Sequence, residues 1–441
     1  MPSIPRAFRI HISSYLPPQE HISLLFLAVL TGVGGALSAV LFRSTFNFIH
    51  YLLHDNNTGM VAIALMLPWW GRLLLPMVGG IAAGSLLSFG LHWAPRRGAD
   101  DYLEAITIGD GTLSVRKTLI KCTSSLCSIV TGASIGREGP MVQLSAMIGS
   151  SLGRIFNLSH DRLRLLVACG VTAGITSAYN APIAGALFVV EIATGSLSKA
   201  TLSPLIVSSV IANIITRWLF GLTAVYKMPT FSMITGWEVF AYAGLGIVCG
   251  LTAPIFRWVL DSARKVFLRF SLGLIFNMAL GGLGVGLISI WEPTVWGNGY
   301  AVVNSILHSP WTWQALLLIL ILKVVATALC SGSGTIGGIF TPTLFVGAAL
   351  GALYGHILMS LAPLSNTEIS GYMMVGMGAF LASVTYAPLM CILMIFEMTL
   401  SYEVVLPLML ACVIGHYLAQ SIRPHSIYTQ RHEEEPPTVA S

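Results

Sequence analysis

Residues 324–367 decide the fold, and they read VVATALCSGSGTIGGIFTPTLFVGAALGALYGHILMSLAPLSNT. This stretch contains no Asp, Glu, Lys or Arg. As one continuous helix it would be about 66 Å long, roughly twice the thickness of a bilayer's hydrocarbon core. The SGSGTIGG segment at 331–338 therefore marks a break inside the membrane. Non-helical backbone persists at that depth only where protein or a water-filled path satisfies its polar groups. The stretch thus predicts broken helices around a transport pathway.

The composition of the whole chain agrees with this prediction. Of the 441 residues, 55% are hydrophobic and 9% are charged, whereas soluble proteins carry about 25% charged residues. A soluble or nucleic-acid-binding globule is excluded on that ground. Apolar runs follow one another from 22–42 to 403–420, and many are too short or too long for a single crossing. We expect an all-α integral membrane protein with tilted transmembrane helices and re-entrant partial helices.

The basic residues at the two ends of the chain predict its orientation. Arg6 and Arg9 precede the first apolar run, and Arg423 and Arg431 follow the last one. Because cytoplasmic loops carry an excess of Lys and Arg, both termini are expected to be cytoplasmic.

The chain contains an internal repeat. Residues 171–194 read VTAGITSAYNAPIAGALFVVEIAT, and residues 376–399 read GMGAFLASVTYAPLMCILMIFEMT. Each has an Ala-Pro pair, ending at Pro182 or Pro388, and a Glu nine residues after the Pro. Transporters commonly pair such repeats and bind substrate where half-helix N-termini meet. The sequence leaves open whether the repeats are parallel or inverted.

A glycine-rich element lies upstream of each repeat and opens an apolar helix. These elements are GREGP at 136–140 and GGIFTP at 337–342. Gly and Pro suit a helix start, where free backbone N–H groups and the helix dipole favour an anion. Two such ends would hold an anion loosely enough to release it, as conduction requires. The pathway motif residues are Gly136, Arg137, Gly139, Pro140, Gly337, Gly338 and Pro342.

Glu138 is the candidate gate and proton acceptor of this pathway. Its carboxylate would occupy the anion site when ionised and leave it when protonated. A capping glutamate that only satisfies backbone donors is the alternative, although ionisable residues within membranes are functional by default. For Lys323 we expect a side chain that reaches the membrane interface. Tyr428 is either one of the aromatic residues common at the membrane–water interface or a residue whose hydroxyl donates to the anion.

Signatures of enzymes and metal sites are missing from the sequence. There is no GxxxxGK[ST], HExxH or GxSxG motif, and none of the seven cysteines forms a CxxC pair. We therefore expect no enzyme activity, no metal site and no cofactor.

These residues closely resemble the CLC family of chloride channels and chloride/proton antiporters. GREGP and GGIFTPTL, the latter at 337–344, match two defining motifs, and Tyr428 matches the family's C-terminal tyrosine. RLLLP at 72–76 and WGNGY at 296–300 look most like the bacterial ClcB branch.

The resemblance implies a homodimer in the bacterial inner membrane, with one anion pathway in each subunit. It implies a transport domain over 22–430, made of two inverted repeats at about 22–222 and 238–430. Residues 1–21 would be a cytoplasmic segment, and 431–441 a disordered cytoplasmic tail. The family binds the anion through backbone amides, here Ile339 and Phe340, and through the hydroxyl of Tyr428, while Glu138 is the gate.

Two departures from the family pattern affect the mechanism. The family motif GSGIPE supplies a serine hydroxyl to the anion, but the corresponding residues 96–102 read RRGADDY. The family's proton-transfer glutamate corresponds to Ile192, taken as a buried aliphatic residue that cannot relay a proton.

Three functions remain open at this point. A gated chloride channel, opened by voltage or pH and able to act as an electrical shunt in acid stress, is the leading prediction. A chloride/proton antiporter is the alternative, and a membrane scaffold without transport is a distant third. The expected partners are chloride, protons or other small anions, membrane lipid and a second copy of the chain, but not nucleic acid.

Overall fold

The computed structural model is helical throughout the part of the chain that it describes. The described residues are 20–54, 59–94, 98–194, 199–221, 226, 238–270, 272–309, 311–361 and 369–428. They contain no β-strand, only the isolated bridges Ala99–Leu113 and Gly136–Gly338. The predicted terminal segments 1–21 and 431–441 lie almost entirely outside the described residues.

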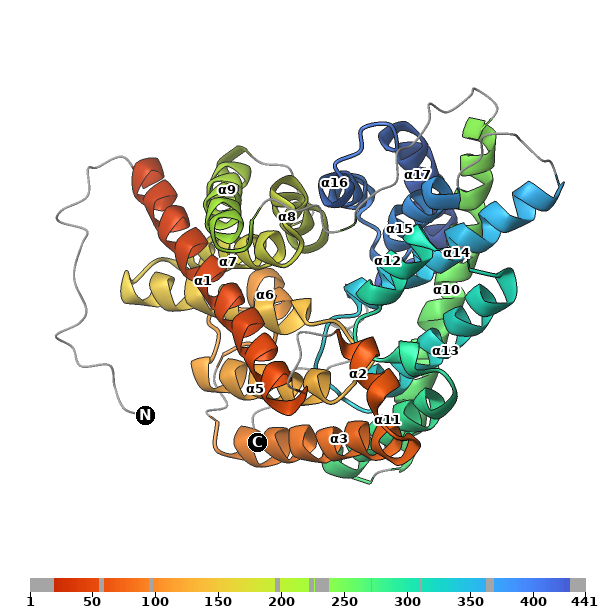
Figure 1. Cartoon of the computed structure of the whole chain (residues 1–441). Coiled ribbons are helices and arrows are strands. Elements are labelled where there is room, and N and C mark those ends of the chain that lie inside the picture. Colours follow the sequence, from red (N-terminus) through yellow and green to blue (C-terminus); the bar gives the residue numbers. More distant parts are fainter. Residues whose placement is uncertain are drawn as a thin grey trace. The chain divides into compact units, whose positions relative to one another are not determined.

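Figure 1 labels most of the helices in chain order. In the N-terminal part they are α1 (Glu20–His54), α2 (Met60–Met66), α3 (Trp69–His92), α4 (Tyr102–Thr107), α5 (Val115–Val130), α6 (Glu138–Ile155), α7 (His160–Tyr179), α8 (Pro182–Phe188), the π-helix η3 (Val189–Thr194) and α9 (Lys199–Phe220). In the C-terminal part they are α10 (Glu238–Phe270), α11 (Leu274–Trp291), the 3-10 helix η4 (Pro293–Val295), α12 (Tyr300–His308), α13 (Trp313–Gly332), α14 (Phe340–Leu361), α15 (Ile369–Thr385), α16 (Pro388–Thr399) and α17 (Val405–Ile422). Eight of the described helices are long and apolar enough to cross a membrane.

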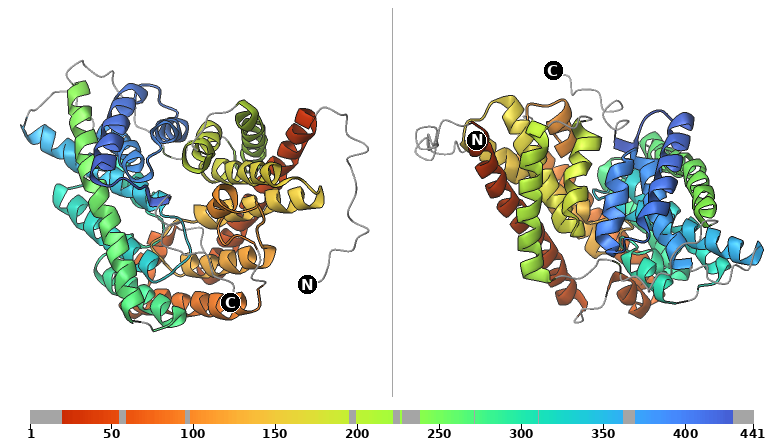
Figure 2. Two further views of the ribbon diagram at one scale, coloured as in Figure 1. Left: turned by 180° about the vertical axis from the view of Figure 1, so that it is seen from behind. Right: turned by 90° about the horizontal axis from the view of Figure 1, so that it is seen from above.

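The described residues divide into two compact units. Unit 1 comprises Met1–Thr45, Leu91–Cys122 and Pro140–Thr223, and unit 2 comprises Phe46–Gly90, Thr123–Gly139 and Ala224–Ser441. Within unit 1, α7, α8 and α9 pack against one another. Within unit 2, α10, α15 and α17 form one packed group and α14 lies along α15 (Figure 2).

The helix breaks lie where the sequence predicts them. The charge-free stretch divides after Gly332, and a new helix begins at Phe340. In the repeats, α7 and α15 both end at a residue with positive φ, Asn180 (57°) and Tyr386 (61°). The alanines that follow have nearly the same backbone angles, φ −121° and ψ 83° at Ala181, and φ −123° and ψ 72° at Ala387. The two repeats therefore share the local geometry of the break.

Small residues allow the helices of unit 2 to pack closely. A Cβ on Gly250 would lie 3.0 Å from the carbonyl oxygen of Gly415, and a Cβ on Gly415 would lie 3.2 Å from that of Gly246. The backbones of α10 and α17 therefore nearly touch, as is usual for helices in membranes.

The position of Lys323 differs from the prediction. Its side chain is 0% exposed, so it does not reach the interface. The Nζ donates to the carbonyl oxygens of Val295, at 2.8 Å, and Gly297, at 2.6 Å. The ammonium also lies 5.9 Å from the centre of the Phe345 ring. The prediction was wrong because α13 presents this residue to a turn whose free carbonyls satisfy a buried ammonium.

Candidate functional site

The two glycine-rich elements meet in unit 2. Gly136 donates its N–H to the carbonyl of Gly338, and Gly338 donates to the carbonyl of Gly136, both at 2.8 Å. This pair joins the segments that lead into α6 and α14. The N-termini of both helices are therefore held at one place, as the repeat pattern predicts.

Glu138, the first residue of α6, turns its carboxylate toward the start of α14. Its Oε1 accepts a hydrogen bond of 3.0 Å from the backbone N–H of Thr341, and the residue is only 6% exposed. The first N–H groups of a helix have no acceptor within the helix and carry partial positive charge. The carboxylate thus lies where the sequence predicts an anion.

Glycine is required on both sides of this carboxylate. A Cβ on Gly136 would lie 1.9 Å from Oε1 of Glu138, and a Cβ on Gly338 would lie 2.4 Å from the same atom. Real Cβ atoms do not approach so closely. Any side chain at these positions would therefore exclude the carboxylate from its place at the helix start.

The other motif residues shape the surroundings of the carboxylate. The guanidinium of Arg137 lies 5.7 Å from the centre of the Phe46 ring, and its positive charge acts on Glu138. A Cβ on Gly139 would lie 3.0 Å from the backbone nitrogen of Gly338, and one on Gly337 would meet the side chain of Ile135. Pro140 and Pro342 lie in the first turns of α6 and α14.

The predicted anion ligands occupy two segments of unit 2. Phe340 is the first residue of α14 and is buried, and Ile339, directly before it, is half-buried. Tyr428 follows α17 and is also half-buried. The hydrogen bond of Glu138 goes to Thr341, a residue that the sequence analysis did not select. Thr341 directly precedes Pro342 at an expected helix start, and this position was the sequence signal that could have identified it.

Tyr226 is a second residue that the sequence analysis missed. It is 1% exposed, and its ring centre lies 5.1 Å from that of Tyr300. Burial raises the pKa of the Tyr226 hydroxyl above its usual range, and the charges of Tyr300 and Glu138 act in the same direction. The hydroxyl therefore stays protonated at neutral pH. Its surrounding sequence, VYKMP, contains no pattern that would have revealed this.

Ile192 lies in the π-helix η3 of unit 1 and is partly exposed, not buried as predicted. An aliphatic side chain has no group that binds a proton in either environment.

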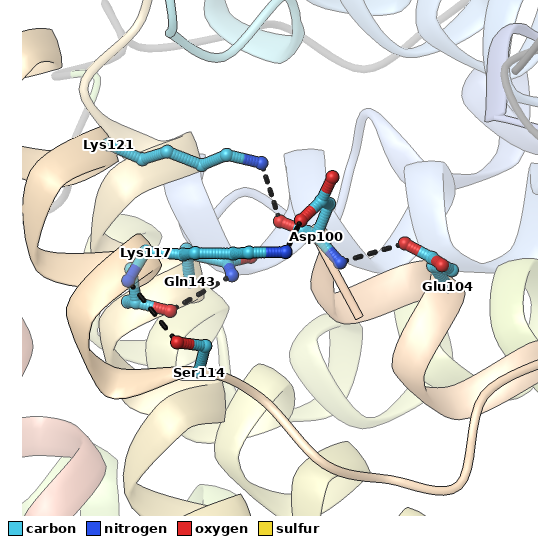
Figure 3. Close-up of polar contacts among 7 residues, drawn as sticks. Asp100, Glu104, Ser114, Lys117, Lys121 and Gln143 are labelled. Atoms are coloured by element: carbon cyan, nitrogen blue, oxygen red, sulfur yellow. Dashed lines mark hydrogen bonds and ion pairs between the residues drawn. The ribbon is translucent and has the colours of Figure 1, made fainter. Parts of the chain in front are cut away.

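Residues 98–102, which belong to the RRGADDY stretch, are tied to α5 by charged residues (Figure 3). The Nζ of Lys117 lies 2.7 Å from Oδ1 of Asp100, and the Nζ of Lys121 donates to the Asp100 carbonyl at 2.7 Å. Asp100 also donates its own N–H to Oε2 of Glu104, at 2.8 Å. Tyr102 donates its N–H to the side-chain oxygen of Gln143, at 3.1 Å. This network holds the segment where α4 begins.

The family profile described as "Voltage gated chloride channel" matches residues 78–420. The chain therefore belongs to the voltage-gated chloride channel family, or CLC family, and is a multi-pass membrane protein.

Relatives place it in the ClcB-like branch of that family. A ClcB-like chloride channel protein of Ralstonia nicotianae is 54% identical over 411 residues, which cover 92% of this chain and 96% of the relative. The voltage-gated ClC-type chloride channel ClcB of Salmonella typhimurium is 39% identical over 414 residues, covering 93% and 99%.

Solved structures confirm the CLC-type fold. A slow cyanobacterial Cl⁻/H⁺ antiporter is similar with a TM-score of 0.78 and 26% identity, covering 95% of this chain and 98% of that chain. A CLC-type fluoride/proton antiporter has the same TM-score of 0.78 at 21% identity, covering 94% and 98%, and supports the fold alone.

Proposed function

We propose that the protein conducts chloride across the membrane and that Glu138 is the gate. The observation that carries the proposal is the hydrogen bond from Thr341 N–H to the Glu138 carboxylate. A carboxylate at a helix start competes with a diffusible anion for the same backbone donors. Protonation removes its negative charge, weakens its hold on those donors and opens the site to chloride.

In this proposal the anion takes the donors that the carboxylate leaves. These are the amides at the start of α14, with those of Ile339 and Phe340 as ligands, and the Tyr428 hydroxyl. Glu138 is the only acid of the two glycine-rich elements, and the matching element at 337–342 contains no charged residue. With no fixed cation among these ligands, release remains fast enough for conduction.

Ile192 favours passive conduction over exchange. It stands where the family has its proton-transfer acid, and it cannot carry a proton. The ClcB relative is described as a voltage-gated channel, which agrees with gated conduction.

A chloride/proton antiporter is the second candidate function. Its support is the similar fold of the cyanobacterial protein, which is described as a Cl⁻/H⁺ antiporter. In that case Glu138 carries the proton on the outer side, and a residue other than Ile192, or water, completes the route.

The setting of this activity belongs to the same proposal. The protein acts as a homodimer in a bacterial inner membrane, with both termini cytoplasmic. Its transport domain extends over 22–430 as two repeats, and transport needs no cofactor, metal or enzymatic step. In acid stress, chloride conduction would electrically offset proton movement.

Proteoliposomes with an imposed chloride gradient test the proposal when internal pH and membrane voltage are recorded together. We expect voltage to settle at the chloride Nernst potential without proton movement. Uphill proton movement driven by chloride would instead establish the antiporter.

The E138A variant tests the gate in the same vesicles. We expect faster chloride flux at neutral pH and loss of the pH response, because no carboxylate remains to occupy the helix start. E403A, which removes an exposed glutamate outside the glycine-rich elements, is the matched control. A scaffold without transport predicts no change in flux for either variant.

A further inference from the structure

A polar cluster lies at the C-terminal end of α17, and none of its residues has yet been assigned a role. Its centre is Arg257 of α10, which is 2% exposed although it lies within an apolar span. Tyr386, the residue that ends α15, and the chain after α17 complete the cluster. All of these residues belong to unit 2.

Tyr386 binds the last carbonyls of α17. Its hydroxyl oxygen lies 2.5 Å from the carbonyl oxygen of Arg423 and 3.2 Å from that of Ala419. The hydroxyl has one proton to donate, and Ala419 already accepts from the N–H of Arg423. The shorter contact, to Arg423, is therefore the principal bond. It satisfies a carbonyl at the helix end that has no partner within the helix.

Arg257 links the Tyr386 hydroxyl to the chain that follows α17. Its Nη1 donates to the Tyr386 hydroxyl at 3.3 Å and also to the carbonyl oxygen of His425. One buried guanidinium thus holds both Tyr386 and the segment that leads to Tyr428.

An ion pair adds a second tie between the same elements. Arg423 Nη2 lies 2.7 Å from Oδ2 of Asp261, four residues after Arg257 on α10. The two side chains are 29% and 30% exposed. A pair with that exposure contributes little to stability, so the buried bonds of Arg257 and Tyr386 are the stronger ties.

The backbone at Tyr386 supports a specific role for its side chain. Its φ of 61° is uncommon for a residue other than Gly, Asn or Asp. The matching residue of the first repeat, Asn180, is a type that tolerates this conformation, and it accepts a bond of 3.1 Å from Nε of Arg217. In each repeat an arginine therefore binds the residue at the helix break. In the second repeat the residue at the break also binds a carbonyl at the end of α17.

We propose that Arg257 and Tyr386 are positioning residues that present the Tyr428 hydroxyl to the anion. Tyr428 lies three residues beyond His425, whose carbonyl Arg257 holds, and Ser426 between them is buried. Fixing His425 places Tyr428 within three residues of a held backbone carbonyl. The inference rests on the proposed function, because it needs Tyr428 to be an anion ligand.

Chloride titration of the detergent-solubilised protein by isothermal calorimetry tests the inference. Y386F removes one hydroxyl and keeps the ring. We expect it to raise the chloride Kd about five-fold, as expected for the loss of one hydrogen bond at the anion. Y428F should have a similar effect, and the double variant Y386F/Y428F should bind no more weakly than Y428F, because both changes remove the same contact. R257K should raise the Kd less than R257M, since lysine keeps one charged donor.

Y372F is the matched control. Tyr372 is a buried tyrosine on α15 whose hydroxyl has no hydrogen-bond partner within the described structure. We expect its chloride Kd to equal that of the parent protein. Hydrogen exchange should rise at residues 423–428 in Y386F and not in Y372F.

Four results would overturn the inference. The first three are an unchanged Kd in Y386F, equal effects of Y386F and Y372F, and a double variant whose loss is the product of the two single losses. An unchanged Kd in Y428F would also overturn it, while leaving the flux test of E138A intact. Failure of the gate would appear in the flux test, so the two failures are distinguishable.

Discussion

At the scale of single residues, one carboxylate and two glycines define the site of the proposed gate. Glu138 reaches the Thr341 N–H only because neither Gly136 nor Gly338 carries a Cβ. Glycine is therefore needed at both positions because any side chain would fill the space that the carboxylate occupies. Their conformational freedom is secondary, because neither has a positive φ.

Gly338→Ala should displace the carboxylate without changing Glu138 itself. The added Cβ would lie 2.4 Å from Oε1, and the far end of a glutamate side chain moves more easily than the paired backbone. We expect chloride flux at neutral pH to rise and its pH response to weaken, as in E138A, measured in proteoliposomes between pH 4 and pH 8.

Gly355→Ala is the control for this prediction. A Cβ there meets its nearest neighbour, a ring atom of Tyr372, at the ordinary contact distance of 3.4 Å. Flux should match the parent. If G338A retained the full pH response of the parent, the close contact of Gly338 would not matter to the gate.

At the scale of elements, short polar segments are tied down by their neighbours. The segment before α4 depends on Asp100, whose side chain meets Lys117 and whose carbonyl meets Lys121 of α5. Burial tends to raise the pKa of the Asp100 carboxyl, but the Lys117 hydrogen bond and the charges of Lys121 and Lys117 outweigh it. The pKa is therefore lowered from its ordinary value.

This lowered pKa predicts how acid affects the stability of the segment. A carboxyl with a lower pKa in the folded state stabilises the fold at pH values above its unfolded pKa, about 3.9. That contribution is lost as pH falls through the folded pKa. D100N should therefore lower the free energy of unfolding at pH 7 by at most about 1 kcal/mol, because the pair is partly exposed. The thermal midpoint should fall slightly as a result. The difference from the parent should shrink as pH falls below the unfolded pKa.

Thermal unfolding of parent and variant in detergent across this pH range checks the prediction. D161N, at an exposed aspartate of unit 1, is the control for the loss of one negative charge. An equal difference at pH 3 and pH 7 for D100N would show that the ion pair is not its source.

At the scale of the whole molecule, few charged residues are available to hold an anion. Only 9% of residues are charged, and the donors proposed for chloride are amides and one hydroxyl. The stretch 96–102, which we expect to correspond to the family's serine motif, reads RRGADDY and contains no serine. Backbone amides bind different small anions similarly, because they impose little size or charge discrimination.

Chloride and nitrate should therefore permeate at similar rates. We expect reversal potentials under bi-ionic conditions to give permeabilities within about a factor of three, which corresponds to less than about 0.7 kcal/mol. Strong exclusion of nitrate would mean that another side chain supplies the missing selectivity.

Much of the fold follows from local sequence patterns. The break between Gly332 and Phe340, and the repeated breaks before Pro182 and Pro388, depend on glycine, proline and hydrophobic length. These signals act within a few residues, so the sequence reveals them directly. Lys323 shows the limit of such rules, since a lysine in an apolar run usually reaches the interface, yet this one is fully buried.

The sequence by itself determined the membrane compartment, the helix breaks and the choice of Glu138, because each depends on composition or on neighbouring residues. The tertiary structure alone decided that Glu138 bonds to Thr341, that Gly136 pairs with Gly338, and that Tyr386 holds the end of α17. These contacts join residues 37 to 203 positions apart. No local pattern specifies such partners, because they are selected only when packed helices bring distant backbone groups within hydrogen-bond distance.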